Sequence, residues 1–150
     1  MSEADNLDEL YQEVILDHCK SPRNFRAVEG ANRKGEGYNP LCGDNYTVSL
    51  KMSGDVVQDA GFQGSGCCIS KASASLLTDA IKGKTKDEVK ALFEQVHNLV
   101  TTGVVAGGGM GKLAVFAGVH KFPARVKCAI LSWHAALAAV NGEDKPVSTE

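Results

Sequence analysis

The sequence has no excess of basic residues, no long hydrophobic run and few aromatic residues. Its 150 residues include 16 Lys and Arg against 18 Asp and Glu. The chain therefore lacks the positive charge with which a non-specific nucleic-acid binder neutralises phosphates. No apolar stretch reaches membrane-spanning length. The opening MSEADNLDEL is acidic and lacks the basic and apolar regions of a secretory signal. These absences predict a cytoplasmic protein that binds neither nucleic acid nor membrane.

Cysteine is too scarce for a fold held together by disulfides. There are five cysteines, an odd number, among 150 residues. A hydrophobic content of 43% is sufficient for a core without metals or disulfides, and the length fits one domain over residues 1–150. We therefore expect the thiols to be reduced and to serve metal binding or chemistry.

Periodicity predicts a helix followed by a hairpin in the first half of the chain. Apolar residues recur at helical spacing over residues 7–18, and Pro22 blocks continuation. Residues 23–41 contain several glycines and little periodicity, which predicts a surface loop. Residues 45–52 alternate polar and apolar side chains, as in a half-buried strand, and residues 56–63 can return as its partner.

Helical signals dominate the second half. Residues 69–82 have helical apolar spacing, and Thr85 with Glu88 forms a capping-box pattern for the next helix. Residues 103–111 are rich in glycine and predict a flexible stretch. Pro123 suits the first turn of a final helix. The order predicts an α+β fold, with an N-terminal helix, a small antiparallel sheet of about three strands, and several helices packed on it.

Cys42 and Asp44 are the first candidates for a functional site. In extended chain, residues two apart point to the same side, so the thiolate and the carboxylate can converge on one Zn²⁺ ion. The simpler alternative is a loop cysteine and a turn aspartate.

Two further cysteines occur near helix starts. Cys67 follows Gly64-Ser65-Gly66, and a helix N-terminus favours a negatively charged sulfur; a small buried core cysteine is the alternative. Cys128 falls opposite the apolar stripe of the last helix, so it is less easily explained as core, and Arg125 and Lys127 add positive charge nearby. Cys19 and Cys68 are interpreted as structural or incidental, and His18 as a core or interface histidine.

Several motifs together resemble the IscU/NifU-N family of iron–sulfur cluster assembly proteins, over about residues 7–140. They occur in the family's order, which makes the resemblance specific. The matching segments are Leu10-Tyr11, Asp17-His18, Ser21-Pro22-Arg23-Asn24-Phe25, Asn39-Pro40-Leu41-Cys42-Gly43-Asp44, Gly64-Ser65-Gly66-Cys67-Cys68-Ile69-Ser70, and Phe122-Pro123-Ala124-Arg125-Val126-Lys127-Cys128.

Three departures from IscU-type sequences resemble the SufU-type branch. Lys127 stands where IscU types have a histidine, the chaperone-binding Leu-Pro-Pro-Val-Lys segment is absent, and the spacing from Cys67 to Cys128 is longer. Cys68 and Cys19 are unusual for the family, since a small or polar residue and an aromatic residue are expected at these positions.

The resemblance implies a zinc site formed by Cys42, Asp44, Cys67 and Cys128, with Arg125 and Lys127 in support. It implies that Cys42 accepts persulfide sulfur from a SufS-like, pyridoxal-phosphate-dependent cysteine desulfurase, for delivery to a downstream iron–sulfur scaffold or carrier. The protein is then a zinc-dependent, sulfurtransferase-like partner of that enzyme.

Three other interpretations stay open at this point. The same four ligands can hold iron or a transient [2Fe–2S] cluster, which would make the protein a scaffold. A cysteine hydrolase using Cys128 and a histidine would need a thiol–imidazole contact in the fold. A purely structural zinc domain would unfold when its metal is removed.

Overall fold

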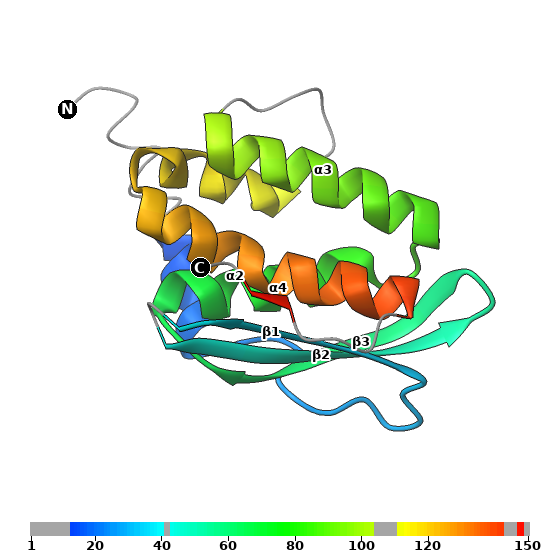
Figure 1. Ribbon diagram of the computed structural model, residues 1–150. Coiled ribbons are helices and arrows are strands. Elements are labelled where there is room, and N and C mark those ends of the chain that lie inside the picture. Colours follow the sequence, from blue (N-terminus) through cyan, green and yellow to red (C-terminus); the bar gives the residue numbers. More distant parts are fainter. Residues whose placement is uncertain (1–12, 41–42, 104–110, 143–146, 149–150) are drawn as a thin grey trace.

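The computed structural model describes residues 13–40, 43–103, 111–142 and 147–148 (Figure 1). A helix over residues 13–20 comes first. The other elements follow in the order β1 (Arg33–Asn39), β2 (Asp44–Ser53), β3 (Val56–Ser65), α2 (Cys68–Ile81), α3 (Lys86–Thr102), the 3₁₀ helix η1 (Gly111–Lys121), α4 (Pro123–Asn141) and β4 (Val147–Ser148).

The strands form one sheet in the order β3-β2-β1-β4. β2 pairs antiparallel with both β1 and β3, and the two-residue β4 pairs parallel with β1. Figure 1 shows α2, α3, η1 and α4 on one side of this sheet. The predicted α+β class is confirmed, with an N-terminal helix, three antiparallel strands and helices packed on them. The sequence pattern does not predict β4 or η1.

The β2–β3 hairpin agrees with the prediction from alternating residues. Tyr46, Val48 and Leu50 point into the core and are fully buried. The turn between the strands contains Gly54 with a φ of 60°, a conformation that glycine adopts without strain. The hairpin therefore places Asp44, the first residue of β2, at the end of the sheet where the next residue, Asn45, pairs with Ser65 of β3.

The prediction of a loop over residues 23–41 is wrong for its last part, which forms strand β1. The strand alternates buried and exposed positions, but its buried positions are Gly35, Gly37 and Asn39. Glycine provides no hydrophobic signal, so the alternation is invisible in the sequence. The glycines are required because α4 lies directly on the strand: a Cβ at position 35 would overlap the carbonyl oxygen of Ala135.

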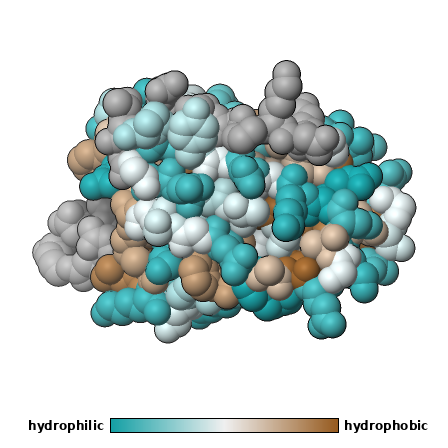
Figure 2. Space-filling view, turned by 60° about the horizontal axis from the view of Figure 1, so that its bottom comes forward, coloured by the Kyte–Doolittle hydropathy of each residue, from teal (hydrophilic) through white to brown (hydrophobic). Residues whose placement is uncertain are grey.

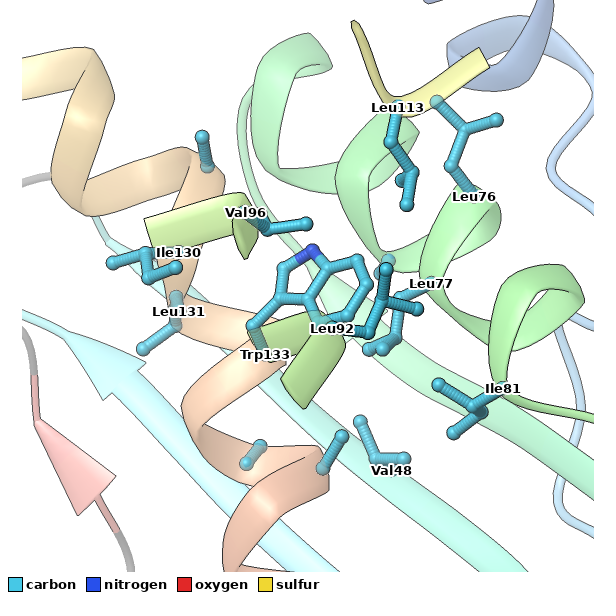
Figure 3. Close-up of a cluster of buried hydrophobic side chains, with 14 of the residues drawn as sticks. Val48, Leu76, Leu77, Ile81, Leu92, Val96, Leu113, Ile130, Leu131 and Trp133 are labelled. Atoms are coloured by element: carbon cyan, nitrogen blue, oxygen red, sulfur yellow. The ribbon is translucent and has the colours of Figure 1, made fainter. Parts of the chain in front are cut away.

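Helix α4 lies between the sheet and the other helices. It packs against β1 and β2 on one side and against α2, α3 and η1 on others. Figure 3 shows Trp133 of α4 surrounded by Leu77, Leu92 and Val96. The indole nitrogen donates a hydrogen bond to Ser73 Oγ at 3.2 Å. Because α4 is covered on several sides, most of its residues are buried, including Cys128.

The helix ends follow the predicted capping residues. Thr85 and Glu88 form the predicted capping box at the start of α3. Pro123 occupies the first turn of α4, also as predicted. Gly103 ends α3 in the left-handed conformation, which a residue with a side chain rarely adopts. Most of the glycine-rich segment predicted over residues 103–111 lies outside the described residues.

The segment after the first helix is anchored by Asn24, which has a φ of 62°. Its carbonyl oxygen accepts the backbone N–H of Phe62 in β3 at 3.0 Å. Its side-chain amide donates to Thr78 and Asp79 of α2, and Lys82 donates to its amide oxygen. Asn24 therefore holds the end of the first helix against both α2 and the sheet.

The outer side of the sheet is not a continuous hydrophobic face. Figure 2 shows mainly hydrophilic residues there, with hydrophobic ones singly or in small groups. Among the described residues, no helix is both long and apolar enough to span a membrane.

His18 is the core histidine that the sequence predicted. It is 1% exposed, and its Nδ1 lies 2.7 Å from Ser75 Oγ. Burial lowers the pKa of His18, and the positive charges of Arg23 and Lys112 lower it further, against the opposing charges of Asp17 and Asp79. The folded state therefore favours the neutral imidazole.

This lowered pKa predicts a loss of stability in mild acid. The unfolded chain binds a proton at His18 from about pH 6.5 downward, before the folded protein does. Stability is thus retained above that pH and falls as the pH drops through the lower, folded-state pKa. We expect the melting temperature of reduced, metal-free protein to fall by roughly a few degrees between pH 7.5 and 5. His18→Gln should flatten this dependence, and an unchanged slope in thermal melts would contradict the assignment.

Candidate metal centre

Three metal-ligating side chains from distant parts of the sequence meet at one end of the molecule. Asp44 begins β2, Cys67 directly precedes α2, and Cys128 lies in the second turn of α4. One carboxylate oxygen and the two sulfur atoms all lie within 4.8 Å of one another. The starts of α2 and α4 and the helix 13–20 gather at the left in Figure 1. This spacing allows one ion to contact all three groups.

Asp44 is oriented by backbone contacts. It is 1% exposed and pairs across the sheet with Asn39 of β1. Its Oδ1 accepts the backbone N–H of Cys67 at 3.0 Å, and its Oδ2 lies 3.9 Å from Cys67 Sγ. The carboxylate is thereby fixed beside the sulfur, with its second oxygen directed towards it.

Cys67 is the N-cap residue of α2. Its Sγ accepts the backbone N–H of Ser70 at 3.4 Å and lies 3.6 Å from Ser70 Oγ. Free N–H groups at the start of a helix favour negative charge, and the thiolate is the form of cysteine that binds metal. The prediction that Cys67 lies at a helix start is confirmed.

Gly66 makes room for this arrangement. A Cβ at position 66 would lie 2.5 Å from Asp44 Oδ1, 2.6 Å from Ser70 Oγ and 2.7 Å from the Tyr46 hydroxyl. These distances are shorter than van der Waals contact. Any other residue would therefore push apart the groups that position Asp44 and Cys67.

Tyr46 and Ser70 lie next to these ligands. Their hydroxyl oxygens are 2.9 Å apart, and both side chains are buried. Burial, together with the negative charges of Asp44, Cys67 and Cys128, raises the pKa of Tyr46 to about 12, against the lowering effect of its hydrogen bond with Ser70. The phenol is therefore neutral at physiological pH and adds no negative charge to the cluster. The sequence pattern marks Tyr46 only as an apolar strand residue and gives no sign of this role for Ser70.

Arg125 supplies positive charge at the cluster. The negative charge of Cys67 raises the pKa of Arg125, and a hydrogen bond and the charge of Cys128 add to this effect. The guanidinium is exposed to solvent, so its interaction is screened by salt. Lys127 is also exposed and immediately precedes Cys128.

The structure brings together three of the four ligands that the resemblance implied. Cys42, the fourth, lies outside the described residues, and the convergence of Asp44 with it stays a prediction. Cys128, which periodicity places opposite the apolar stripe of the last helix, is fully buried, because α4 is covered on several sides, and it belongs to this cluster. Two thiolates and a carboxylate are ligands that suit Zn²⁺, so the donor set fits this ion.

The expectation that the thiols are reduced is wrong for one pair of cysteines at this end of the molecule, whose contact was not predicted. Cys19 and Cys68, both interpreted from the sequence as structural or incidental, are joined as a disulfide. Cys19 is in the helix 13–20 and Cys68 is the first residue of α2. Both positions depart from the family pattern, and this was the one sign that the two cysteines belong together. Their separation of 49 positions gives no indication that they are close in space.

Comparison with known proteins agrees with this geometry. Residues 10–140 match the model of the NifU-like N-terminal domain. The chain belongs to this family. A zinc-dependent sulfurtransferase SufU from Bacillus subtilis (strain 168) is 41% identical over 145 residues, covering 96% of this chain and 98% of the relative. This chain therefore belongs to the SufU-type branch of the family, as its motifs indicated.

Two other similar proteins are described as iron–sulfur cluster assembly scaffolds. An iron–sulfur cluster assembly scaffold protein IscU from Streptococcus pyogenes serotype M1 is 38% identical over 135 residues, covering 89% of this chain and 84% of the relative. A solved structure from Fervidobacterium islandicum AW-1, described as a candidate scaffold protein for the SUF system, has a TM-score of 0.77. It is 32% identical and covers 85% of this chain and 94% of that chain.

Proposed function

We propose that this NifU-like domain accepts and transfers sulfur for iron–sulfur cluster assembly, at a zinc site formed by Cys42, Asp44, Cys67 and Cys128. The observation that supports this most directly is the meeting of Asp44, Cys67 and Cys128 within 4.8 Å. The high similarity over nearly the whole chain to a relative named as a zinc-dependent sulfurtransferase points the same way.

Each residue has a role in this proposal. Cys42 is the nucleophile: its thiolate attacks the terminal sulfur of a persulfide on a cysteine desulfurase. A new S–S bond forms on Cys42, and the desulfurase cysteine leaves as a thiolate, so the exchange needs no external electrons. Zn²⁺ would keep the site thiols deprotonated without redox chemistry of its own. Arg125 and Lys127 offset the negative charge of the ligands.

The partners follow from this chemistry. A pyridoxal-phosphate-dependent, SufS-like cysteine desulfurase supplies the sulfur, and a downstream iron–sulfur scaffold or carrier receives it. Free ligand thiolates persist in a reducing compartment, so we propose a cytoplasmic location, where the Cys19–Cys68 disulfide is open to reduction. In this role the protein acts as a sulfurtransferase-like partner of the desulfurase.

The test is alanine release from cysteine by the desulfurase in iron-free buffer containing a thiol reductant. We expect zinc-loaded protein to stimulate release strongly and Cys42→Ala to abolish the stimulation while keeping the fold. Cys19→Ser, which removes a cysteine outside the ligand set, is the matched control and should stimulate like wild type.

Two results would overturn the proposal. Full stimulation by Cys42→Ala would remove the assigned acceptor. No stimulation by folded, zinc-loaded wild type, together with visible absorption after supply of iron and sulfide, would favour the scaffold function on the same ligands, since a zinc site is colourless.

A further inference from the structure

The disulfide between Cys19 and Cys68 joins two elements that are far apart in the sequence. The residues are separated by 49 positions, and their Cα atoms are 5.2 Å apart, within the range that a disulfide spans. Both residues are half-buried. Small thiols and disulfides in solution can therefore reach the pair, unlike a fully buried cysteine pair in a core.

The crosslink lies beside the candidate metal site. Cys68 directly follows Cys67, whose sulfur belongs to the ligand cluster. The chain segment enclosed by the crosslink, residues 19–68, contains Cys42, Asp44 and Cys67. Only Cys128 of the proposed ligands lies outside it. Closing this ring thus constrains the part of the chain that supplies three of the four ligands.

Noncovalent contacts hold the two cysteines near each other independently of the crosslink. His18, next to Cys19, lies 2.7 Å from Ser75 Oγ of α2, and the backbone N–H of Arg23 donates to the same oxygen at 2.8 Å. Arg23 also forms an ion pair with Asp17 at 2.7 Å. The helix 13–20 therefore stays against α2 when the S–S bond is broken, and the bond can form again in place.

We propose that Cys19 and Cys68 form a reversible thiol–disulfide site that controls how firmly the neighbouring metal site holds its ion. This inference rests on the proposed zinc site. Oxidation proceeds by exchange with a small disulfide such as glutathione disulfide. One protein thiolate attacks it and releases one thiol, and the second protein thiolate then displaces the other. The protein loses two electrons and two protons, the small disulfide becomes two thiols, and excess thiol reverses the reaction.

The consequence for the metal follows from the position of Cys68. In the oxidised protein the start of α2 is tied to the helix 13–20, so local opening around Cys67 is restricted. In the reduced protein the contacts at Ser75 remain, but the start of α2 is no longer tied to the helix 13–20, and Cys67 leaves the ion more often. We expect zinc to leave the oxidised protein about threefold to tenfold more slowly than the reduced protein, since a crosslink limits local unfolding.

The experiment uses zinc-loaded full-length protein equilibrated in glutathione buffers of different redox ratio. Differential alkylation and peptide mapping identify which cysteines are joined, and transfer of zinc to a coloured chelator gives its release rate. We expect oxidation to join Cys19 to Cys68 with zinc retained and to slow release. Cys19→Ser and Cys68→Ser should release zinc at the reduced wild-type rate in every buffer.

Other outcomes would overturn the inference. One is oxidation that joins Cys67 or Cys128 and expels zinc. Another is a Cys19–Cys68 crosslink that leaves the release rate unchanged; this would leave the proposed zinc site intact. Failure of reduced wild type to bind zinc would overturn both the inference and the proposed function. Thermal melts of each variant identify any that fails to fold, and in that case the remaining single-cysteine variant provides the comparison.

Discussion

Replacing Cys128 by alanine should leave the protein folded but nearly free of zinc. Cys128 is completely buried and its sulfur lies within 4.8 Å of the other two described ligand atoms. Alanine removes the sulfur and leaves only a small gap, which costs little packing energy compared with the loss of a zinc–thiolate bond. We expect the bound zinc to fall from about one equivalent to less than a tenth after exposure to a competing chelator.

Metal analysis of the purified protein, together with circular dichroism, measures this effect. Cys19→Ala removes a cysteine that is not among the ligands, and under reducing conditions it should retain about one equivalent, like reduced wild type. A Cys128→Ala protein that kept its zinc would show that Cys128 is a core cysteine and that the ion is held elsewhere. An unfolded Cys128→Ala protein would instead indicate a structural zinc domain, contrary to a fold whose core is already extensive.

Replacing Gly35 by alanine should destabilise the protein more than most single substitutions. The added Cβ would overlap the carbonyl oxygen of Ala135 and lie 3.1 Å from the backbone nitrogen of Ala139, both in α4. These are backbone atoms, so neither can rotate away, and the helix must lift off the strand. We expect a loss of about 3–5 kcal/mol in the free energy of unfolding.

Urea unfolding of reduced protein measures this change. Gly118→Ala is the matched control, because a Cβ at position 118 has no neighbour within 4 Å, and it should change stability by about 0.5 kcal/mol or less. Equal stabilities for the two variants would mean that β1 and α4 separate easily and that the close packing contributes little.

Much of the fold could be predicted from the sequence because most elements carry a local signal. The alternation around Tyr46 and Val48 gave the hairpin, and Thr85 with Glu88 gave the start of α3. β1 was missed because Gly35 and Gly37 occupy its buried positions. Its side-chain pattern is set by α4, a partner helix that begins only at Pro123.

The metal site was predicted through resemblance rather than through local pattern. Spacing alone could not show that Asp44, Cys67 and Cys128 meet, because their approach depends on the packing of a sheet and two helices. Helix periodicity placed Cys128 opposite the apolar stripe of α4 but could not show that this side of the helix is also buried. The Cys19–Cys68 contact could not be predicted for the same reason: only the folded chain brings the helix 13–20 to the start of α2.

The close contact of α4 with the glycines of β1 has a consequence for how this protein can change in evolution. One side of the metal site is carried by α4 and the other by the end of β2, which pairs with β1. The separation of helix and strand is set where backbone touches backbone, at Gly35. Substitutions among the larger core residues can therefore accumulate with little effect on the spacing of the metal ligands. Gly35 and Gly37, where α4 lies against β1, should tolerate almost no substitution.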